Sequence, residues 1–282
     1  MNVSKLAVVG AGQMGTGIAQ VAATAGLSVV LLDVSEDLAR RGLAAVEKGL
    51  DRAIEKGKLA PEEKREVLAR IQAGACLSLT SDADVAIEAV FERVDVKEDV
   101  LRKLDALLPP AAVIASNTSS ISITRLASAT RRPENVVGMH FMNPVPAMKL
   151  VEIISGEATS DETRRAAWEL AERMGKVPVA VSDYPGFVAN RLLIPMINEA
   201  AYCLMEGVAS REDIDTVMRL GMNHPMGPLA LADLIGLDTC LHIMEVLYEG
   251  FRDPKFRPCP LLRRMVDAGH LGRKVGKGFY TY

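Results

Sequence analysis

The sequence of 282 residues predicts an α/β protein, with a Rossmann-type, doubly wound and mostly parallel sheet followed by an all-helical C-terminal domain. Three observations support this prediction. Short apolar runs alternate with helical patterns over the first part of the chain. A glycine-rich segment joins the first of these runs to the first helix. From residue 184 onward almost only helical patterns follow, so we expect two domains, residues 1–183 and 184–282.

The first elements surround the glycine-rich segment. Residues 6–9 form a short β-branched run that predicts a strand, residues 16–25 have a helical pattern, and residues 29–32 predict a second strand. The segment between the first strand and the helix is Gly10-Ala-Gly-Gln-Met-Gly15. This order of strand, turn, helix and strand is the context that a dinucleotide-binding motif requires. The alternative is a strand-to-helix turn that binds nothing.

Each glycine of this segment has its own expected role. Gly10 would allow the tight turn, Gly12 would let the backbone approach a pyrophosphate, and Gly15 would let the helix pack closely on the strand. The unpaired N–H groups at the helix start attract phosphate oxygens. We therefore expect a dinucleotide to contact the segment at Gly10, Gly12, Gln13, Met14 and Gly15.

Asp33 closes the second strand, 18 residues after Gly15, and indicates which dinucleotide binds. A carboxylate there accepts hydrogen bonds from the ribose hydroxyls of NAD and repels the additional phosphate of NADP. Arg40 and Arg41 lie farther along and are expected on a solvated helix face. The sequence thus favours NAD over NADP, although pocket geometry could outweigh a single carboxylate. It also favours NAD over FAD, because no second flavin-type segment follows.

The rest of the first domain is expected to hold a helical hairpin and then more strands. Residues 36–58 and 61–71 predict the two helices of this excursion, with Pro61 in the first turn of the second. The first of them has an apolar stripe of Leu38, Leu43, Val46, Leu50 and Ile54. A helix is expected at residues 96–107. Further strands are expected at residues 84–90, 113–116, 136–139, 150–154 and 177–181.

The second domain is expected to consist of helices. They are predicted at residues 187–193, 196–206, 212–220, 229–248 and 261–268. The segment from Asn190 to Ala200 is apolar on more than one side. Two interpretations carry equal weight: a helix at the centre of its own domain, or a helix that also contacts a second subunit.

Composition excludes several classes of partner. The formal net charge of −3 and the isoelectric point near 5.9 give no basic surface for nucleic acid or an anionic membrane. No apolar stretch approaches the roughly 18 residues of a transmembrane span. Because the N-terminus enters a strand almost at once, we expect no signal peptide.

Cysteine and histidine positions argue against a metal site and against disulfides. Cys76, Cys203, Cys240 and Cys259 are scattered, without metal-binding spacing or a disulfide framework, which is typical of a reduced cytoplasmic protein. The histidines do not fall at ligand spacing on one element, so we expect no bound metal. They are His140, His224, His242 and His270.

His140 is the candidate for proton transfer. It ends an apolar predicted strand, at the edge of a parallel sheet where ligands of such folds bind. The prolines of Asn143-Pro-Val-Pro146 stiffen the loop that follows. Glu152 lies 12 residues on, inside another apolar strand, where an isolated carboxylate is costly. An imidazole one strand away would be a suitable partner, and the pair would fix one tautomer and favour the protonated ring. The alternative for His140 is a structural residue.

Two further blocks carry candidate polar groups. The segment from Ser116 to Ser120 follows a strand and precedes a helix, so its hydroxyls either cap that helix or reach a substrate oxygen. Asn190 opens the helical domain. An amide on an apolar helix face needs a buried polar partner, and a substrate carbonyl would serve.

These motifs together resemble those of the short-chain L-3-hydroxyacyl-CoA dehydrogenases, and among them the bacterial 3-hydroxybutyryl-CoA dehydrogenases. The resemblance covers essentially the whole chain. Besides the glycine-rich segment it rests on residues 116–120, 140–146, 149–152, 185–191, 223–228 and 271–280. It implies a Rossmann domain, a helical domain that forms a homodimer, NAD as cofactor and an acyl-CoA thioester as substrate.

The resemblance also implies roles for particular residues. The implied catalytic set is Ser119, His140, Glu152 and Asn190. His140 would accept the proton of the 3-hydroxyl, Glu152 would orient the imidazole, and Ser119 and Asn190 would position substrate oxygens. Implied cofactor contacts are Asp33, Glu92, Lys97, Ser119, Asn143 and Lys274. Implied substrate contacts are Lys56, Ser119, Asn143 and Asn190; where some relatives carry a small polar residue at a coenzyme A contact, this chain has Gly49.

Three alternatives differ from an NAD-dependent 3-hydroxybutyryl-CoA dehydrogenase. One is a 3-hydroxyacyl-CoA dehydrogenase of fatty-acid degradation that prefers longer chains, which pocket depth would decide. Another is a dinucleotide-binding protein without turnover, whose sign would be the loss of His140 or Glu152; both are present. The third is a dehydrogenase of free β-hydroxyacids, which would use a catalytic lysine instead.

Overall fold

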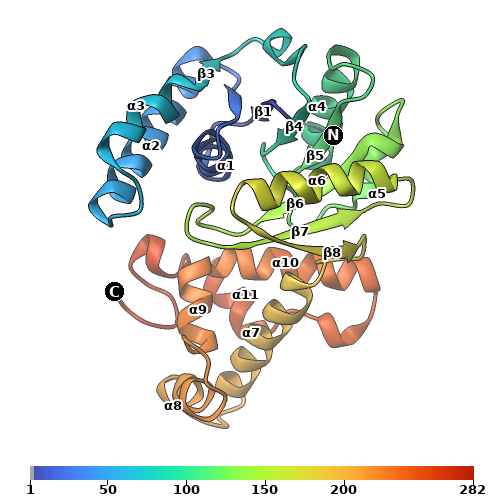
Figure 1. Cartoon of the computed structure of the whole chain (residues 1–282). Helices are drawn as coiled ribbons and strands as arrows, with labels where there is room; N and C mark the ends of the chain where they lie inside the picture. Colours follow the sequence, from blue (N-terminus) through green and yellow to red (C-terminus); the bar gives the residue numbers. More distant parts are fainter. Residues whose placement is uncertain (1–2) are drawn as a thin grey trace. The chain divides into compact units, whose positions relative to one another are not determined.

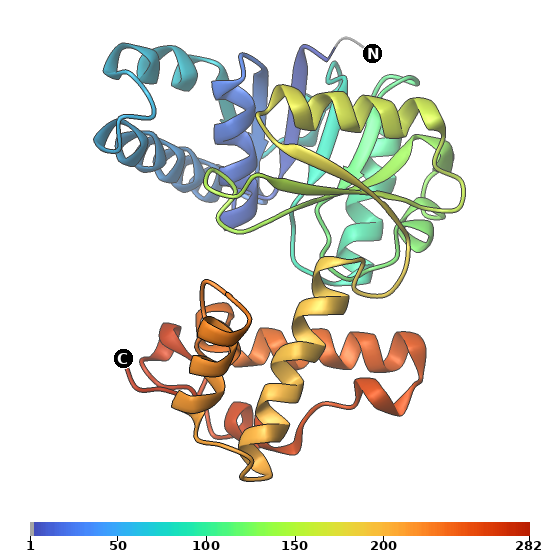
Figure 2. The same ribbon diagram turned by 60° about the horizontal axis from the view of Figure 1, so that its bottom comes forward.

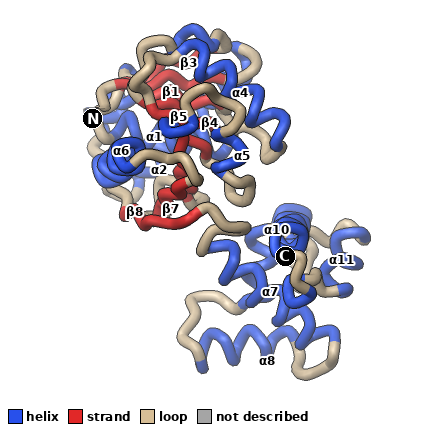
Figure 3. Tube along the Cα trace, turned by 90° about the vertical axis from the view of Figure 1, so that its right-hand side faces the viewer, coloured by secondary structure: helices blue, strands red, loops and turns tan. Residues whose placement is uncertain are grey.

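The computed structural model describes residues 3–282, and it divides into two compact units. The first ends at Asp183 and the second runs from Tyr184 to Tyr282 (Figure 1). The first unit holds a sheet between helices, and Figure 3 shows its strands in red. The second holds helices, joined at its end by short bridges at Gly272, Lys277 and Thr281.

The sheet of the first unit has eight strands in the order β3-β2-β1-β4-β5-β6-β7-β8. Their bounds are β1 Lys5–Val9, β2 Ser28–Leu32, β3 Ile71–Gly74, β4 Val85–Glu88, β5 Val113–Ser116, β6 Val136–Phe141, β7 Leu150–Ser155 and β8 Val177–Ser182. Every neighbouring pair is parallel except β6 and β7, which are antiparallel. The predicted fold class, a mostly parallel Rossmann-type sheet with a helical second part, is confirmed.

Helices cover the sheet on both faces. They are α1 Gln13–Thr24, α2 Glu36–Glu55, α3 Pro61–Ala69, α4 Val94–Leu107, α5 Ile123–Ala127 and α6 Asp161–Arg173, with 3₁₀ turns at Leu77–Thr80 and Pro133–Asn135. On one face, Ile18 of α1 and Leu170 of α6 join strand residues such as Val8 and Met139 in a buried core. Strands that are buried on both faces have nearly continuous apolar sequences, and this is why they can be predicted from the sequence.

The excursion after β2 differs from its prediction in two respects. Ile71 is not the end of a helix; it begins the edge strand β3, in which it pairs with Val29 of β2. Four residues with one strongly apolar side chain give too weak an alternation to indicate a strand. Leu38 is 40% exposed and lies outside the buried stripe of α2, whereas Val46 and Leu50 are buried as predicted, together with Ala39 and Gly42.

Two other elements of the first unit depart from the sequence prediction. β6 continues to Phe141, because Phe141 pairs with Val151 of the antiparallel β7; His140 therefore lies inside the strand and does not end it. The helix α6 was not expected. It begins after Ser160, whose hydroxyl accepts a hydrogen bond from the Thr163 N–H.

The second unit has its own core of helices, drawn in gold to red in Figure 2. Its helices are α7 Ala189–Met205, α8 Arg211–Thr216, α9 Pro228–Ile235, α10 Leu237–Phe251 and α11 Pro260–Asp267, with a π-turn at Val217–Gly221 and 3₁₀ turns at Pro254–Phe256 and Arg273–Val275. The expected break near Pro195 is wrong, because α7 runs through it. The single helix expected over 229–248 is two helices, separated at Gly236 with φ of 105°.

A buried carboxylate holds the last residues of the second unit. Asp233, which is 1% exposed, accepts hydrogen bonds from the backbone N–H groups of Phe279 and Tyr280, each at 2.8 Å. The Tyr282 hydroxyl donates to the same carboxylate at 3.1 Å. The C-terminal segment is thereby fixed against α9.

Candidate active site

The glycine-rich segment has the geometry that its three glycines predict. Gly10 has φ of 106°, a backbone conformation that favours glycine, and its N–H donates to the Leu32 carbonyl of the neighbouring strand β2 at 2.7 Å. A Cβ at Gly15 would lie 1.8 Å from the Gly10 carbonyl oxygen. The helix α1 can therefore pack this closely on the turn only because residue 15 has no side chain. A Cβ at Gly12 would meet nothing within 4 Å. The backbone at Gly12, which caps α1 without a side chain, is thus open to a phosphate.

Asp33 lies beside this segment and also holds it in place. One carboxylate oxygen accepts the Ala11 N–H at 2.8 Å and the other accepts the Val34 N–H at 2.7 Å. The side chain is half-buried, and each oxygen can accept a further hydrogen bond. The bond to Ala11 is a structural role that the sequence did not reveal. Arg40 is exposed and pairs with Asp37 at 3.4 Å, as expected for a solvated face.

His140 and Glu152 form the pair that the sequence predicts. The two residues are direct neighbours in the antiparallel register of β6 and β7. His140 Nδ1 lies 2.7 Å from Glu152 Oε2, and the residues are 7% and 2% exposed. A carboxylate on Nδ1 fixes the tautomer and the orientation of the ring. The structure thus brings the two predicted residues together in one hydrogen-bonded pair, and their catalytic role remains a prediction.

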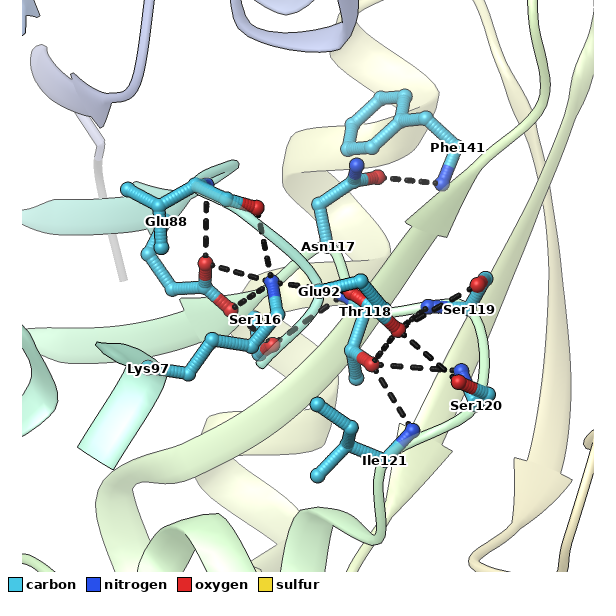
Figure 4. A network of polar contacts seen from close by, with 11 residues as sticks. Glu88, Glu92, Lys97, Ser116, Asn117, Thr118, Ser119, Ser120, Ile121 and Phe141 are labelled. Atoms are coloured by element: carbon cyan, nitrogen blue, oxygen red, sulfur yellow. Dashed lines mark hydrogen bonds and ion pairs between the residues drawn. The ribbon is translucent and has the colours of Figure 1, made fainter. Parts of the chain in front are cut away.

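A buried charged network lies at the ends of β4 and β5 (Figure 4). Lys97 of α4 donates to both carboxylate oxygens of Glu88, at 2.9 and 2.8 Å, and neither residue is more than 1% exposed. The Ser116 hydroxyl donates to Glu88 Oε1 and accepts the Thr118 N–H at 3.2 Å. This network anchors the start of the polar segment that follows β5.

Glu92 organises the rest of that segment. Its Oε1 accepts hydrogen bonds from the hydroxyls of Thr118, Ser119 and Ser120, and from the Ser119 N–H at 2.9 Å. Its Oε2 lies 3.2 Å from Lys97 Nζ (Figure 4). Burial by itself would raise the pKa of Glu92. The charge of Lys97 and the hydrogen bonds from Thr118 and Ser119 outweigh it, so the pKa of Glu92 lies below its ordinary value.

The lowered pKa of Glu92 predicts a pH-dependent contribution to stability. Because the folded-state pKa lies below the unfolded one, the stabilisation is complete above about pH 4.5, the ordinary Glu value, and disappears as pH falls through the folded-state pKa. We expect Glu92→Gln to lower the free energy of unfolding by about 1–2 kcal/mol at pH 7. Urea unfolding at pH 7, 5 and 3 would measure this. A difference between variant and wild type that stays constant down to pH 3 would contradict it.

Two side-chain amides hydrogen-bond at the end of β6 and in the loop that follows it. The Asn117 side-chain oxygen accepts the Phe141 N–H at 3.0 Å. The Gln13 amide, at the start of α1, donates to the Asn143 side-chain oxygen at 3.1 Å. Asn143 is therefore tied to the glycine-rich segment, which the sequence did not indicate.

The remaining predicted site residues have the following places within their own units. Asn190 is half-buried in the first turn of α7, in the second unit. Lys274, also in the second unit, donates to both carboxylate oxygens of Asp238 at 2.6 Å. Lys56 is exposed and caps the C-terminal end of α2. Their roles remain predictions.

Two absences hold for residues 3–282. No cluster of three or more His, Cys, Asp or Glu side chains in that range could hold a metal ion. Over the same range, every helix is too short or too polar to span a membrane.

Family models match both units of the chain. The NAD binding domain of 3-hydroxyacyl-CoA dehydrogenase matches residues 5–184, and the C-terminal domain of the same enzyme matches residues 186–282.

Individual relatives match over nearly their whole length. A probable 3-hydroxybutyryl-CoA dehydrogenase of Bacillus subtilis is 56% identical, with 100% of this chain and 98% of the relative covered. The 3-hydroxybutyryl-CoA dehydrogenase of Bradyrhizobium diazoefficiens is 54% identical, with 99% and 96% covered. Among solved structures, (S)-3-hydroxybutyryl-CoA dehydrogenase from Ralstonia eutropha is 52% identical with a TM-score of 0.97, and 100% of this chain and 99% of that chain are covered.

Proposed function

Because the chain belongs to the 3-hydroxyacyl-CoA dehydrogenase family, we propose that it interconverts (S)-3-hydroxybutyryl-CoA and acetoacetyl-CoA with NAD as cofactor. It is an NAD-dependent oxidoreductase. The observation that carries the proposal is the buried His140–Glu152 pair, 2.7 Å apart, on a sheet whose glycine-rich turn is open to a phosphate at Gly12. The four-carbon substrate is favoured because the relatives of 50–56% identity are named for it.

The protein's own part in the reaction is proton transfer and orientation. When bound, NAD supplies the acceptor for the hydride that leaves C3 of the substrate. His140 accepts the proton of the 3-hydroxyl at Nε2, since Glu152 engages Nδ1, and returns it in the reverse direction. The Glu152 carboxylate stabilises the imidazolium that forms. Ser119 and Asn190 position the substrate oxygens by hydrogen bonds.

Binding is assigned to the residues that the motifs select. The proposed cofactor contacts are Gly10, Gly12, Gln13, Met14, Gly15, Asp33, Glu92, Ser119, Asn143 and Lys274, and Lys97 has an indirect part. Lys97 is buried between Glu88 and Glu92, so it contributes through the charge and position of Glu92. Lys56, an exposed ammonium, attracts the phosphates of coenzyme A.

The Asp33 carboxylate predicts a preference for NADH over NADPH. We expect NADPH to bind at least about tenfold more weakly than NADH, because a phosphate beside a carboxylate is repelled. Asp33→Asn keeps a hydrogen-bond acceptor but removes the negative charge. The ratio of the NADPH to the NADH dissociation constant should therefore fall toward one. Dissociation constants from nucleotide fluorescence would measure both. Asp37→Asn, at an exposed carboxylate on the first turn of α2, is the control and should leave the ratio unchanged.

The proposal is tested by mixing purified protein with acetoacetyl-CoA and NADH and following the loss of nicotinamide absorbance. Turnover supports it, whereas NADH binding without turnover would indicate a dinucleotide-binding protein of another kind. A second candidate is a dehydrogenase of 3-hydroxyacyl-CoA thioesters not restricted to four carbons, because a relative of 40% identity over 99% of this chain, from Sus scrofa, is named a hydroxyacyl-coenzyme A dehydrogenase. Comparing kcat/KM for four-carbon and longer 3-oxoacyl thioesters decides between them.

We further propose that the protein forms a homodimer and that it is located in the reducing environment of the cytoplasm. All four cysteines carry free thiols, and α7 exposes Leu192 (69%) although its other side is in the core. Light scattering during size-exclusion chromatography would give the mass; a species of one chain would refute the dimer.

A further inference from the structure

Lys176 is a buried lysine outside the residues assigned above. It lies between α6 and β8, and its backbone N–H donates to the Ala171 carbonyl at 3.0 Å. The residue is only 8% exposed. Burial lowers the pKa of Lys176, since a buried ammonium loses its hydration. A lysine kept in such a place needs strong hydrogen-bond acceptors.

Those acceptors are two carbonyl groups of one loop. The Lys176 ammonium donates to the carbonyl of Val145 at 2.5 Å and to that of Met148 at 2.9 Å. Both belong to residues 142–149, the loop that joins β6 to β7 and hence His140 to Glu152. Hydrogen bonds from a charged donor are about twice as strong as neutral ones. Lys176 therefore holds this loop from the side of β8.

The same loop is also in contact with α1. Val145 is 2% exposed, and a Cβ added at Gly17 would lie 2.8 Å from its Cβ, so helix and loop are in close contact. Asn143, two residues earlier, accepts the hydrogen bond from Gln13 at the start of α1. The loop thus joins the catalytic strand pair to the glycine-rich segment.

From this arrangement we infer that Lys176 is a positioning residue for cofactor binding, which acts by fixing the 142–149 loop so that Asn143 stays against the glycine-rich segment. The inference rests on the proposed function, because that function places the dinucleotide beside Gly12 and Asn143. Lys176 itself would touch neither cofactor nor substrate. Its effect passes through the two carbonyl contacts and the backbone between Val145 and Asn143.

The test is the dissociation constant for NADH, measured by fluorescence, in Lys176→Met. Methionine keeps an unbranched apolar side chain but removes both hydrogen bonds to the loop. We expect the dissociation constant for NADH to rise about tenfold. A change of this size corresponds to the contribution of one charge-assisted hydrogen bond. Lys176→Arg keeps a charged donor and should restore most of the affinity. If Lys176→Met does not fold, Lys176→Gln replaces it, with an expected weakening of at least about threefold.

A matched control separates positioning from general stability. Arg132 is another cation that donates to backbone carbonyls in the first unit, those of Asp105, Leu108 and Pro109. Arg132→Met should lower the melting temperature and leave NADH affinity unchanged.

If the lysine variants lose stability like Arg132→Met but bind NADH within twofold of wild type, Lys176 is merely structural and the inference is wrong. If the wild type binds NADH but does not reduce acetoacetyl-CoA, the proposed substrate fails while the comparison of NADH affinities still decides the role of Lys176.

Discussion

Replacing His140 with glutamine is expected to reduce kcat for acetoacetyl-CoA reduction by about 10³-fold, with little change in the dissociation constant of NADH. The imidazole is the group that holds the proton, and general acid–base catalysis typically contributes 10²–10⁴-fold. Glutamine can still hydrogen-bond to Glu152 but cannot transfer a proton. Steady-state kinetics gives kcat, and fluorescence titration gives the NADH affinity.

Two further variants, one at Glu152 and one at a distant histidine, test the same role. Glu152→Gln should also reduce kcat, because the imidazolium loses its neighbouring charge at 2.7 Å. His242→Gln alters an exposed histidine of α10 and should leave kcat unchanged. If His140→Gln weakens NADH binding as much as it reduces kcat, the histidine is a binding residue and the proton-transfer role is wrong.

Replacing Lys97 with methionine is expected to destabilise the first unit by about 3–5 kcal/mol, because it leaves the Glu88 carboxylate buried without its cation. Glu88 is 0% and Lys97 1% exposed, so water cannot replace the lost interaction. For a domain of this size the melting temperature should fall by roughly 6–20 °C. Differential scanning calorimetry and urea unfolding would measure the loss.

Two variants test the physical reason for this loss. Lys103→Met removes a lysine of the same helix whose pair with Asp99, at 2.7 Å, is more than half exposed on both sides. Exposed pairs contribute about 0–1 kcal/mol, so the effect should be small. Adding Glu88→Gln to Lys97→Met removes the unpaired charge and should recover at least half of the lost stability. A double variant no more stable than Lys97→Met would show that packing, and not charge, is responsible.

The parts of the fold that the sequence predicts are those with long, regular patterns. The glycine-rich segment was predictable from its spacing, and the buried strands and helices α1, α2 and α4 of the first unit from their repeated apolar residues, whereas α6 was not. β3 was not, since four residues at a sheet edge carry little pattern. In the second unit the sequence predicts a helix break at Pro195, where α7 continues. It predicts none at Gly236, which separates α9 from α10.

The candidate site was predictable where one residue type contradicts its surroundings. An acid inside an apolar strand indicates Glu152, and the same reasoning identifies Glu88, which ends the apolar strand β4. The second role of Asp33, its bond to the Ala11 N–H, could not be predicted, because it depends on the path of the turn and not on residue type.

The direct pairing of His140 with Glu152 across β6 and β7 has a consequence for how this protein can change in length. Successive strand residues point to opposite faces, so deleting or inserting one residue within either strand would turn one member of the pair away from the other. Point replacements elsewhere in the two strands leave the alignment intact. Insertions and deletions that preserve turnover should therefore be found outside these two strands, even where amino-acid exchanges within them are tolerated.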